Sequence, residues 1–209
     1  MQQYKLPLHA AEAEFVEKKS RFICNVTPIS SEDEALAFIS QIRSKYRDAN
    51  HNVFAYKLKS GNICRFNDDG EPSGTAGMPL LDTFVKQDIY DFCAVATRYF
   101  GGIMLGGGGL VRAYSRTGAI GLEASGIGIM RELTLCSLDL PYPQYEVIKR
   151  RVSASGAKIT NEDFGERVFL SFSLPSEDLP ELEKSVLEMT AGSVCVIRDS
   201  TELGVFKDY

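Results

Sequence analysis

Along the first third of the chain, apolar and polar positions change from the period of a strand to the period of a helix. Residues 13–29 form two β-rich runs that break at residues 18–20, which predicts a hairpin or a bent strand. Ser31 and Glu34 have the spacing of a capping box, and apolar residues then recur at helical intervals over residues 35–46. The pattern therefore predicts strands followed by an amphipathic helix.

The middle of the chain predicts a second hairpin and a buried strand. Residues 51–70 contain two short β-like segments on either side of a turn, and residues 78–87 have helical character. Residues 91–100 form a continuous apolar run, which is typical of a strand buried on both faces. Helical spacing then returns over residues 110–125.

The pattern restarts near Thr134 as a second set of elements. We expect a strand at 135–142, a helix at 143–155, strands at 157–165 and 166–175, a helix at 176–192 and a strand at 193–200. This βαββαβ order is typical of the ferredoxin-like split βαβ fold. The sequence thus predicts an α+β protein with two domains, residues 1–134 and residues 135–209.

Composition is that of an ordinary globular protein, with 44% of the 209 residues hydrophobic and 24% charged. The five cysteines are widely spaced and only two histidines are present, so we expect no disulfide framework, no metal site and no cofactor. No apolar run approaches the roughly 20 residues that span a bilayer, and the first residues do not resemble a secretory leader. We therefore expect a cytoplasmic protein without a membrane partner.

Charge is divided unevenly between the two predicted domains. Residues 1–134 hold 15 Lys and Arg against 15 Asp and Glu, whereas residues 135–209 hold 8 against 13. The second part therefore carries the whole net charge of −5. Broad attraction to nucleic acid is not encoded, but a local basic face on the first part is compatible with these totals.

A glycine-rich stretch, RYFGGIMLGGGG at residues 98–109, lies between the buried strand and the following helix. Backbone N–H groups at such a turn can bind a phosphate or a carboxylate, although neither GxGxxG nor GxxxxGK[ST] is matched. The alternative is that the glycines serve only positive φ angles and close backbone packing. The glycines considered for binding are Gly101, Gly102, Gly106, Gly107 and Gly108.

Three arginines flank the glycines and add a preference for a phosphate-bearing partner. Arg98 ends the buried strand, and Arg112 and Arg116 are four residues apart on one face of the next helix. Guanidinium groups that converge there would suit bidentate contacts to phosphate oxygens. Tyr99 offers a stacking surface for single-stranded nucleic acid, although packing at the end of a strand is the alternative for Arg98 and Tyr99.

An acidic loop and one histidine complete the candidate residues. Asp68, Asp69 and Glu71 would suit Mg²⁺, but their spacing is unspecific, and an Asp-Gly turn that caps the hairpin is the favoured explanation. His51 begins a predicted strand and has no identifiable partner for acid–base catalysis, which favours a structural role.

Three segments taken together resemble the signature of the IMPACT/YigZ family (UPF0029), and the resemblance covers nearly the whole chain. They are DANHNVFAY at 48–56, DDGEPSGTAG at 68–77 and AVATRYFGGIMLGGGGLVRAY at 94–114. The resemblance implies a first domain like the second domain of small-subunit ribosomal protein five, and a second domain like the ferredoxin-like domains of elongation factor G. It also marks a candidate site made of His51, Asp68, Asp69, Glu71, Arg98, Gly101, Gly102, Gly106 and Arg112.

Three functions are compatible with these features. The first is a non-catalytic binding protein that contacts RNA, the ribosome or a translation factor, because the sequence contains no recognisable nucleophile and base. The second is a protein adaptor, for which the acidic second domain would supply the contact surface. The third is an enzyme or sensor that binds a small phosphorylated ligand at the glycine-rich stretch.

Overall fold

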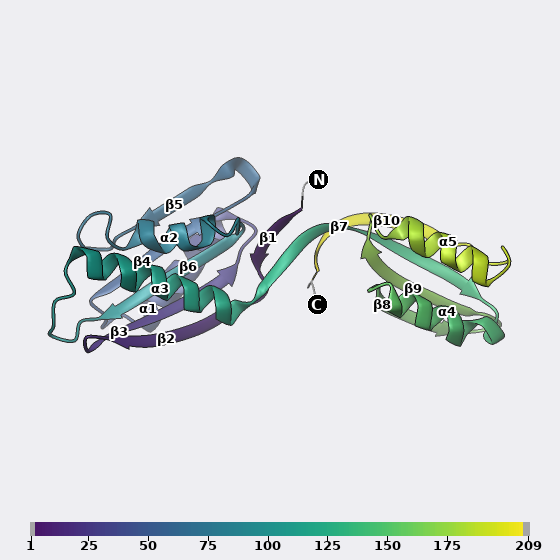
Figure 1. The fold of residues 1–209 in the computed structure, drawn as a ribbon, viewed down its shortest axis with the longest axis horizontal. Coiled ribbons are helices and arrows are strands. Elements are labelled where there is room, and N and C mark those ends of the chain that lie inside the picture. The colour runs from purple at the N-terminus through teal and green to yellow at the C-terminus, as the bar shows by residue number, and fades with distance from the viewer. Residues whose placement is uncertain (1–2, 207–209) are drawn as a thin grey trace. The chain divides into compact units, whose positions relative to one another are not determined.

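The computed structural model describes residues 3–206 and is an α+β protein, as predicted. Two compact units are present: residues 4–129, the N-terminal unit, and residues 130–205, the C-terminal unit (Figure 1). The division falls inside one long strand. The likeness of the two units to domains of ribosomal protein five and elongation factor G stays a prediction.

A five-stranded antiparallel sheet forms the centre of the N-terminal unit, in the order β2-β3-β6-β4-β5. The strands are β2 (Ala11–Glu17), β3 (Ser20–Pro28), β4 (His51–Lys57), β5 (Cys64–Asn67) and β6 (Phe92–Tyr99), and the short β1 (Tyr4–Pro7) precedes them. The first predicted hairpin is confirmed: Lys18 and Lys19, with φ of 46° and 65°, form the tight turn between β2 and β3.

Helices cover both faces of this sheet. α1 (Glu32–Lys45) lies on one face, and α2 (Gly77–Val85) and α3 (Gly107–Ser125) lie on the other; a single 3₁₀ turn (Ser60–Asn62) connects β4 to β5. Ser31 caps α1, because its hydroxyl accepts the Glu34 N–H at 3.2 Å, but the Glu34 carboxylate accepts the N–H of Ser30 at 2.6 Å and not that of Ser31, so only one half of the expected capping box forms. No helix within residues 3–206 is long and apolar enough to cross a lipid bilayer.

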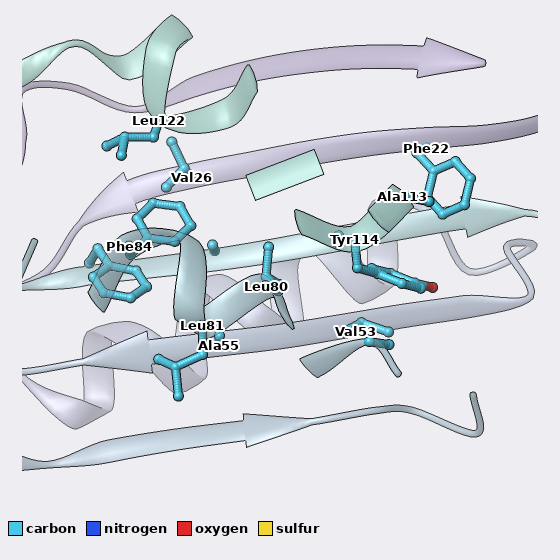
Figure 2. Packing of buried hydrophobic residues seen from close by; sticks show 14 of the residues in the cluster. Phe22, Val26, Val53, Ala55, Leu80, Leu81, Phe84, Ala113, Tyr114 and Leu122 are labelled. Carbon is cyan, nitrogen blue, oxygen red and sulfur yellow. The ribbon is translucent and has the colours of Figure 1, made fainter. Parts of the chain in front are cut away.

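β6 is the central strand, and its alternating side chains supply both cores. Figure 2 shows the core on the α2 and α3 face, where Leu80 and Phe84 of α2 and Tyr114 of α3 pack over β4 and β6. Cys93 and Val95 of β6 point to the opposite core, under α1. All residues of β6 except Tyr99 are buried, which confirms the prediction of a strand buried on both faces.

The C-terminal unit has the predicted βαββαβ order. Its elements are β7 (Ile127–Leu140), α4 (Tyr142–Ala154), β8 (Lys158–Phe164), β9 (Val168–Pro175), α5 (Leu179–Met189) and β10 (Ile197–Phe206). β7 lies between β10 and β9, and β8 is at the edge beside β9, as in a split βαβ fold. β7 begins earlier than residue 135, because Gly126, with φ of 62°, ends α3 and the chain extends at once.

α3 packs against β3 at a distance that only glycine allows at one position. A Cβ atom on Gly121 would lie 2.3 Å from the Cys24 Sγ and 3.0 Å from its Cβ. The Cys24 thiol is fully buried, and this burial raises its pKa to about 12. The helix and the sheet are therefore held in direct contact by small side chains.

We predict that Gly121→Ala destabilises the protein by about 1–3 kcal/mol, because the added methyl group overpacks the contact with Cys24. The control is Gly108→Ala, in the first turn of the same helix, where the nearest atom to the new Cβ is 3.7 Å away. Urea unfolding measures both free energies. Equal stability of Gly121→Ala and the parent protein would contradict the predicted contact.

Candidate functional site

The candidate residues gather where β4 begins and β6 ends. His51 and Arg98 are directly paired in the β4–β6 register. Both side chains point to the α2 and α3 face, because they continue the alternation set by Val53 and Ala96 in that core. The segment that follows β6, residues 101–109, is called the glycine loop below, and its last three residues form the first turn of α3.

A buried ion pair forms the centre of this region. Arg98 Nη1 donates to Glu71 Oε1 at 2.7 Å, and the exposed fractions of the two side chains are 7% and 3%. The Tyr114 hydroxyl donates to the same oxygen at 2.7 Å, and burial together with the Glu71 charge raises the pKa of Tyr114 well above its usual value. His51 Nε2 lies 3.8 Å from Glu71 Oε1. These four residues are called the Glu71 cluster below.

Arg98 is otherwise enclosed by neighbouring residues. Its Nη2 donates to the Ser20 hydroxyl at 3.4 Å, and its guanidinium carbon lies 5.5 Å from the ring centres of both Phe22 and Phe100. The Nε atom is buried and has no acceptor in the part of the chain that the structure describes. The main partner of this arginine is therefore internal.

Asp68 closes the acidic loop and starts α2. Its carboxylate accepts the N–H groups of Gly74 at 2.8 Å, Ala76 at 3.2 Å and Gly77 at 2.7 Å. These donors include the first backbone groups of α2, which have no partner within the helix. Asp68 thus caps the start of α2, a role that differs from both roles considered in the sequence, a metal ligand and a turn that caps the hairpin.

Asp69 is also bound within the fold. Its carboxylate accepts the Asn52 N–H at 2.7 Å and an Arg43 N–H at 2.9 Å. Its carbonyl oxygen lies 2.8 Å from His51 Nδ1, which places a proton on that nitrogen and holds the ring. Within residues 3–206, no group of three or more His, Cys, Asp or Glu side chains is arranged to hold a metal ion.

The glycine loop combines the two roles considered for it. A Cβ atom on Gly101 would lie 2.0 Å from the Lys19 carbonyl carbon, so this glycine serves close backbone packing against the β2–β3 turn. Gly102 and Gly106, with φ of 82° and 73°, turn the chain into α3. The N–H groups of residues 107–109, in the first turn of α3, have no acceptor among the described residues.

Two hollows lie on either side of Leu105. The first, called the loop cavity, has a volume of about 410 Å³ and is lined by Asn50, His51, Glu71, Pro72, Arg98, Phe100, Met104, Leu105, Gly106, Gly107 and Leu110. The second, called the basic hollow, has a volume of about 250 Å³ and is lined by Phe15, Glu17, Lys18, Leu105, Gly109, Arg112, Ala113 and Arg116. The loop cavity is within the size range of small-molecule sites.

The predicted residues are thus divided among several places. Arg112 and Arg116 line the basic hollow, whereas Arg98 lines the loop cavity, so the three guanidinium groups do not form one clamp. Arg116 lies 3.8 Å from Glu17, and Arg112 has no ion-pair partner within residues 3–206. The Tyr99 hydroxyl donates to Asp48 at 2.8 Å, away from both hollows.

Sequence reasoning misses two members of the site. Tyr114 lies within the helix expected at 110–125, and no local pattern in the sequence indicates a role for it. Its side chain is fully buried, and a buried tyrosine hydroxyl requires a hydrogen-bond partner, which Glu71 provides. Lys18 is predicted only as a turn residue. Its position in the basic hollow depends on α3 packing beside the β2–β3 hairpin, which no local pattern reveals.

Comparison with known protein families supports the resemblance noted in the sequence. The model of the Impact N-terminal domain matches residues 18–122, which include every residue of the Glu71 cluster. The model of a domain of unknown function (DUF1949) matches residues 138–193.

Individual relatives match both units. The chain is 36% identical over 184 residues to the IMPACT family member YvyE of Bacillus subtilis, which covers 88% of this chain and 85% of that protein. It is 33% identical over 182 residues to YigZ of Escherichia coli, which covers 85% of this chain and 88% of that protein. A crystal structure of a hypothetical protein is 30% identical, with a TM-score of 0.60, covering 96% of this chain and 98% of that chain.

We predict that Glu71→Gln destabilises the protein by about 3–5 kcal/mol, because it leaves the buried Arg98 charge without a counterion. The matched control is Glu14→Gln, which removes a carboxylate from an exposed pair with Arg21 and should change stability little. Urea unfolding at pH 7 compares the two variants. Equal losses would show that the Glu71 pair is not a buried anchor.

We also predict that Asp68→Asn loosens the loop at residues 68–77, because an amide offers one oxygen where the carboxylate accepts three N–H groups. The expected cost is about 1–3 kcal/mol for donors left without acceptors. Limited proteolysis should then cut within this loop before the rest of the chain. An unchanged cleavage pattern would contradict the capping role.

Proposed function

This chain belongs to the IMPACT family, and we propose that it is a non-catalytic protein that binds single-stranded RNA in association with translation. The observation that carries the proposal is the basic hollow, where Lys18, Arg112 and Arg116 lie beside the glycine loop. The link to translation rests on the family resemblance. RNA free in solution and RNA within the ribosome would present the same phosphates to this surface.

Three cations and one acidic residue line this hollow, although the chain as a whole carries −5. Lys18 and Lys19 of the β2–β3 turn and Arg112 of α3 have no ion-pair partner among the described residues. Glu17 is the one acidic residue among those lining the hollow, and it lies 3.8 Å from Arg116. A local excess of cations attracts a phosphate chain even where the total charge is negative.

Aromatic and backbone groups beside these cations suit a single strand. Phe100 is 48% exposed, and the N–H groups of residues 107–109 point out of the first turn of α3. Proteins that hold single-stranded nucleic acid combine cationic grooves with aromatic surfaces on which bases stack. The N-terminus of a helix adds further attraction for phosphate.

The loop cavity supports binding more than catalysis. Among its described lining residues there is no Ser, Thr, Cys or Lys to act as a nucleophile. The Glu71 oxygen nearest His51 already accepts two hydrogen bonds, from Arg98 and Tyr114. The second candidate, an enzyme or sensor for a small phosphorylated ligand, is favoured by the volume of about 410 Å³.

The test is the salt dependence of RNA binding by the whole chain and by Lys18→Asn/Lys19→Gly. Asn-Gly is the preferred sequence for a two-residue turn with positive φ at both positions, so this variant removes two cations while it preserves the hairpin. Removing one cation that binds a phosphate of a single strand reduces the slope of log K against log salt by about 0.7. We expect the slope to fall by at least about 0.7 in this variant, because Lys18 lines the basic hollow and Lys19 is its neighbour in the turn.

The control variant is Lys57→Gln/Lys86→Gln, which removes the same charge at the other end of the N-terminal unit, where β4 and α2 end. It should bind RNA with the parent slope. Binding that does not change with salt, or an equal decrease of the slope in both variants, would overturn the proposal. A thermal shift caused by a nucleotide with Mg²⁺, without RNA binding, would favour the second candidate.

A further inference from the structure

We propose that the loop cavity holds one nucleotide of the bound strand, with its base inside the cavity and its phosphate at the start of α3. This inference deepens the proposed RNA binding and rests on it. Its basis is the chemistry of the residues that line the cavity, which include apolar side chains, the carboxylate of Glu71 and glycines at the start of α3.

The apolar wall suits the faces of a base. Phe100, Met104 and Leu105 line the cavity beside Leu110, and the exposed fractions of Phe100 and Met104 are 48% and 83%. Exposed side chains of this size beside a cavity are shielded from water when a flat ligand covers them. Base–aromatic stacking alone strengthens binding by roughly fivefold to 100-fold.

The acidic side of the cavity suits the edge of a base that carries N–H groups. Glu71 Oε1 is occupied by Arg98 and Tyr114, whereas its second oxygen, Oε2, has no donor among the described residues. A carboxylate accepts hydrogen bonds from exocyclic amino groups, as in its pairing with the N4 amino group of cytosine. We therefore expect cytosine to bind more tightly than uracil, which has an oxygen at that position.

The charges also orient the nucleotide. Arg98 neutralises Glu71, so this ion pair offers no net charge to a phosphate, and we expect the phosphate to lie beside Gly106 and Gly107 at the start of α3. The open N–H groups of residues 107–109 supply donors there. Beyond Leu105 lies the basic hollow with Lys18 and Arg112, where the next phosphate of the strand would bind.

Two neighbouring glycines provide a matched pair of variants. Gly107 lines the cavity, and a Cβ atom there would have Thr75 Cγ2 at 4.0 Å as its nearest neighbour, so Gly107→Leu adds a side chain at the cavity wall without a clash at its Cβ atom. Gly108 does not line the cavity, and a Cβ atom there would lie 3.7 Å from Arg112 Nη1. Gly108→Leu keeps its backbone N–H group and adds a side chain beside Arg112 and not at the cavity, so it is the control for base binding in the same turn of the same helix.

The experiment titrates the whole chain with short single-stranded RNAs that carry one 2-aminopurine at a different position each. We expect one position to change fluorescence strongly in the parent protein and in Gly108→Leu, and to show no such change in Gly107→Leu. Affinity of Gly107→Leu should fall at least fivefold, with an unchanged salt slope because the phosphate contacts remain. Replacing uridine by cytidine at that position should strengthen binding by the parent protein and by Gly108→Leu, and leave binding by Gly107→Leu unchanged.

The outcomes separate this inference from RNA binding itself. If RNA binds but Gly107→Leu and Gly108→Leu behave alike, the cavity assignment is wrong and the basic hollow alone carries binding. If neither RNA nor cytidine monophosphate binds, both proposals fail. If cytidine monophosphate binds to the parent protein and not to Gly107→Leu, but RNA does not bind, the cavity takes a free nucleotide, and single-stranded RNA is not the partner.

Discussion

The buried pair of Arg98 and Glu71 is the interaction on which the rest of the N-terminal unit depends. Arg98 lies near the end of β6, Glu71 lies in the acidic loop, and Tyr114, which donates to the same carboxylate, lies in α3. Charges with exposed fractions of 7% and 3% are costly to bury, and good geometry must offset that cost. Three separate segments are therefore held in one relative position by a single oxygen atom.

This anchor explains why so many polar residues lie around one loop. Asp68 caps the backbone of residues 74–77, and Asp69 binds the start of β4 and a side chain of α1. The contacts to the N–H groups of Asn52 and Gly77 satisfy partly buried donors that would otherwise have no partner. The acidic loop, which suggests metal chemistry when read alone, is the connector that brings α2 and the end of the sheet together.

The elements are predictable from the sequence because each depends on local signals. The Ser31 cap before α1, the turn at residues 18–20 and the apolar run of β6 all appear as expected. Which candidate residues line the loop cavity and which line the basic hollow is not predictable from the sequence. That division depends on strand alternation and on the packing of distant segments. Arg98 and Tyr99 are adjacent in sequence but point to opposite faces, one toward Glu71 and the other toward Asp48.

The same reasoning explains how a protein with an acidic total charge can have a surface suited to phosphate. Its buried arginine neutralises Glu71, so this ion pair leaves no net charge beside the loop cavity. The surface cations Lys18 and Arg112, on the far side of Leu105, have no ion-pair partner among the described residues. Arg98 and Arg112 both flank the glycine loop in the sequence, but their burial differs. Arg98 is buried and anchors the fold, whereas Arg112 is exposed. The glycine loop between them places the open start of α3 beside both hollows, and this arrangement requires the anchor to remain intact.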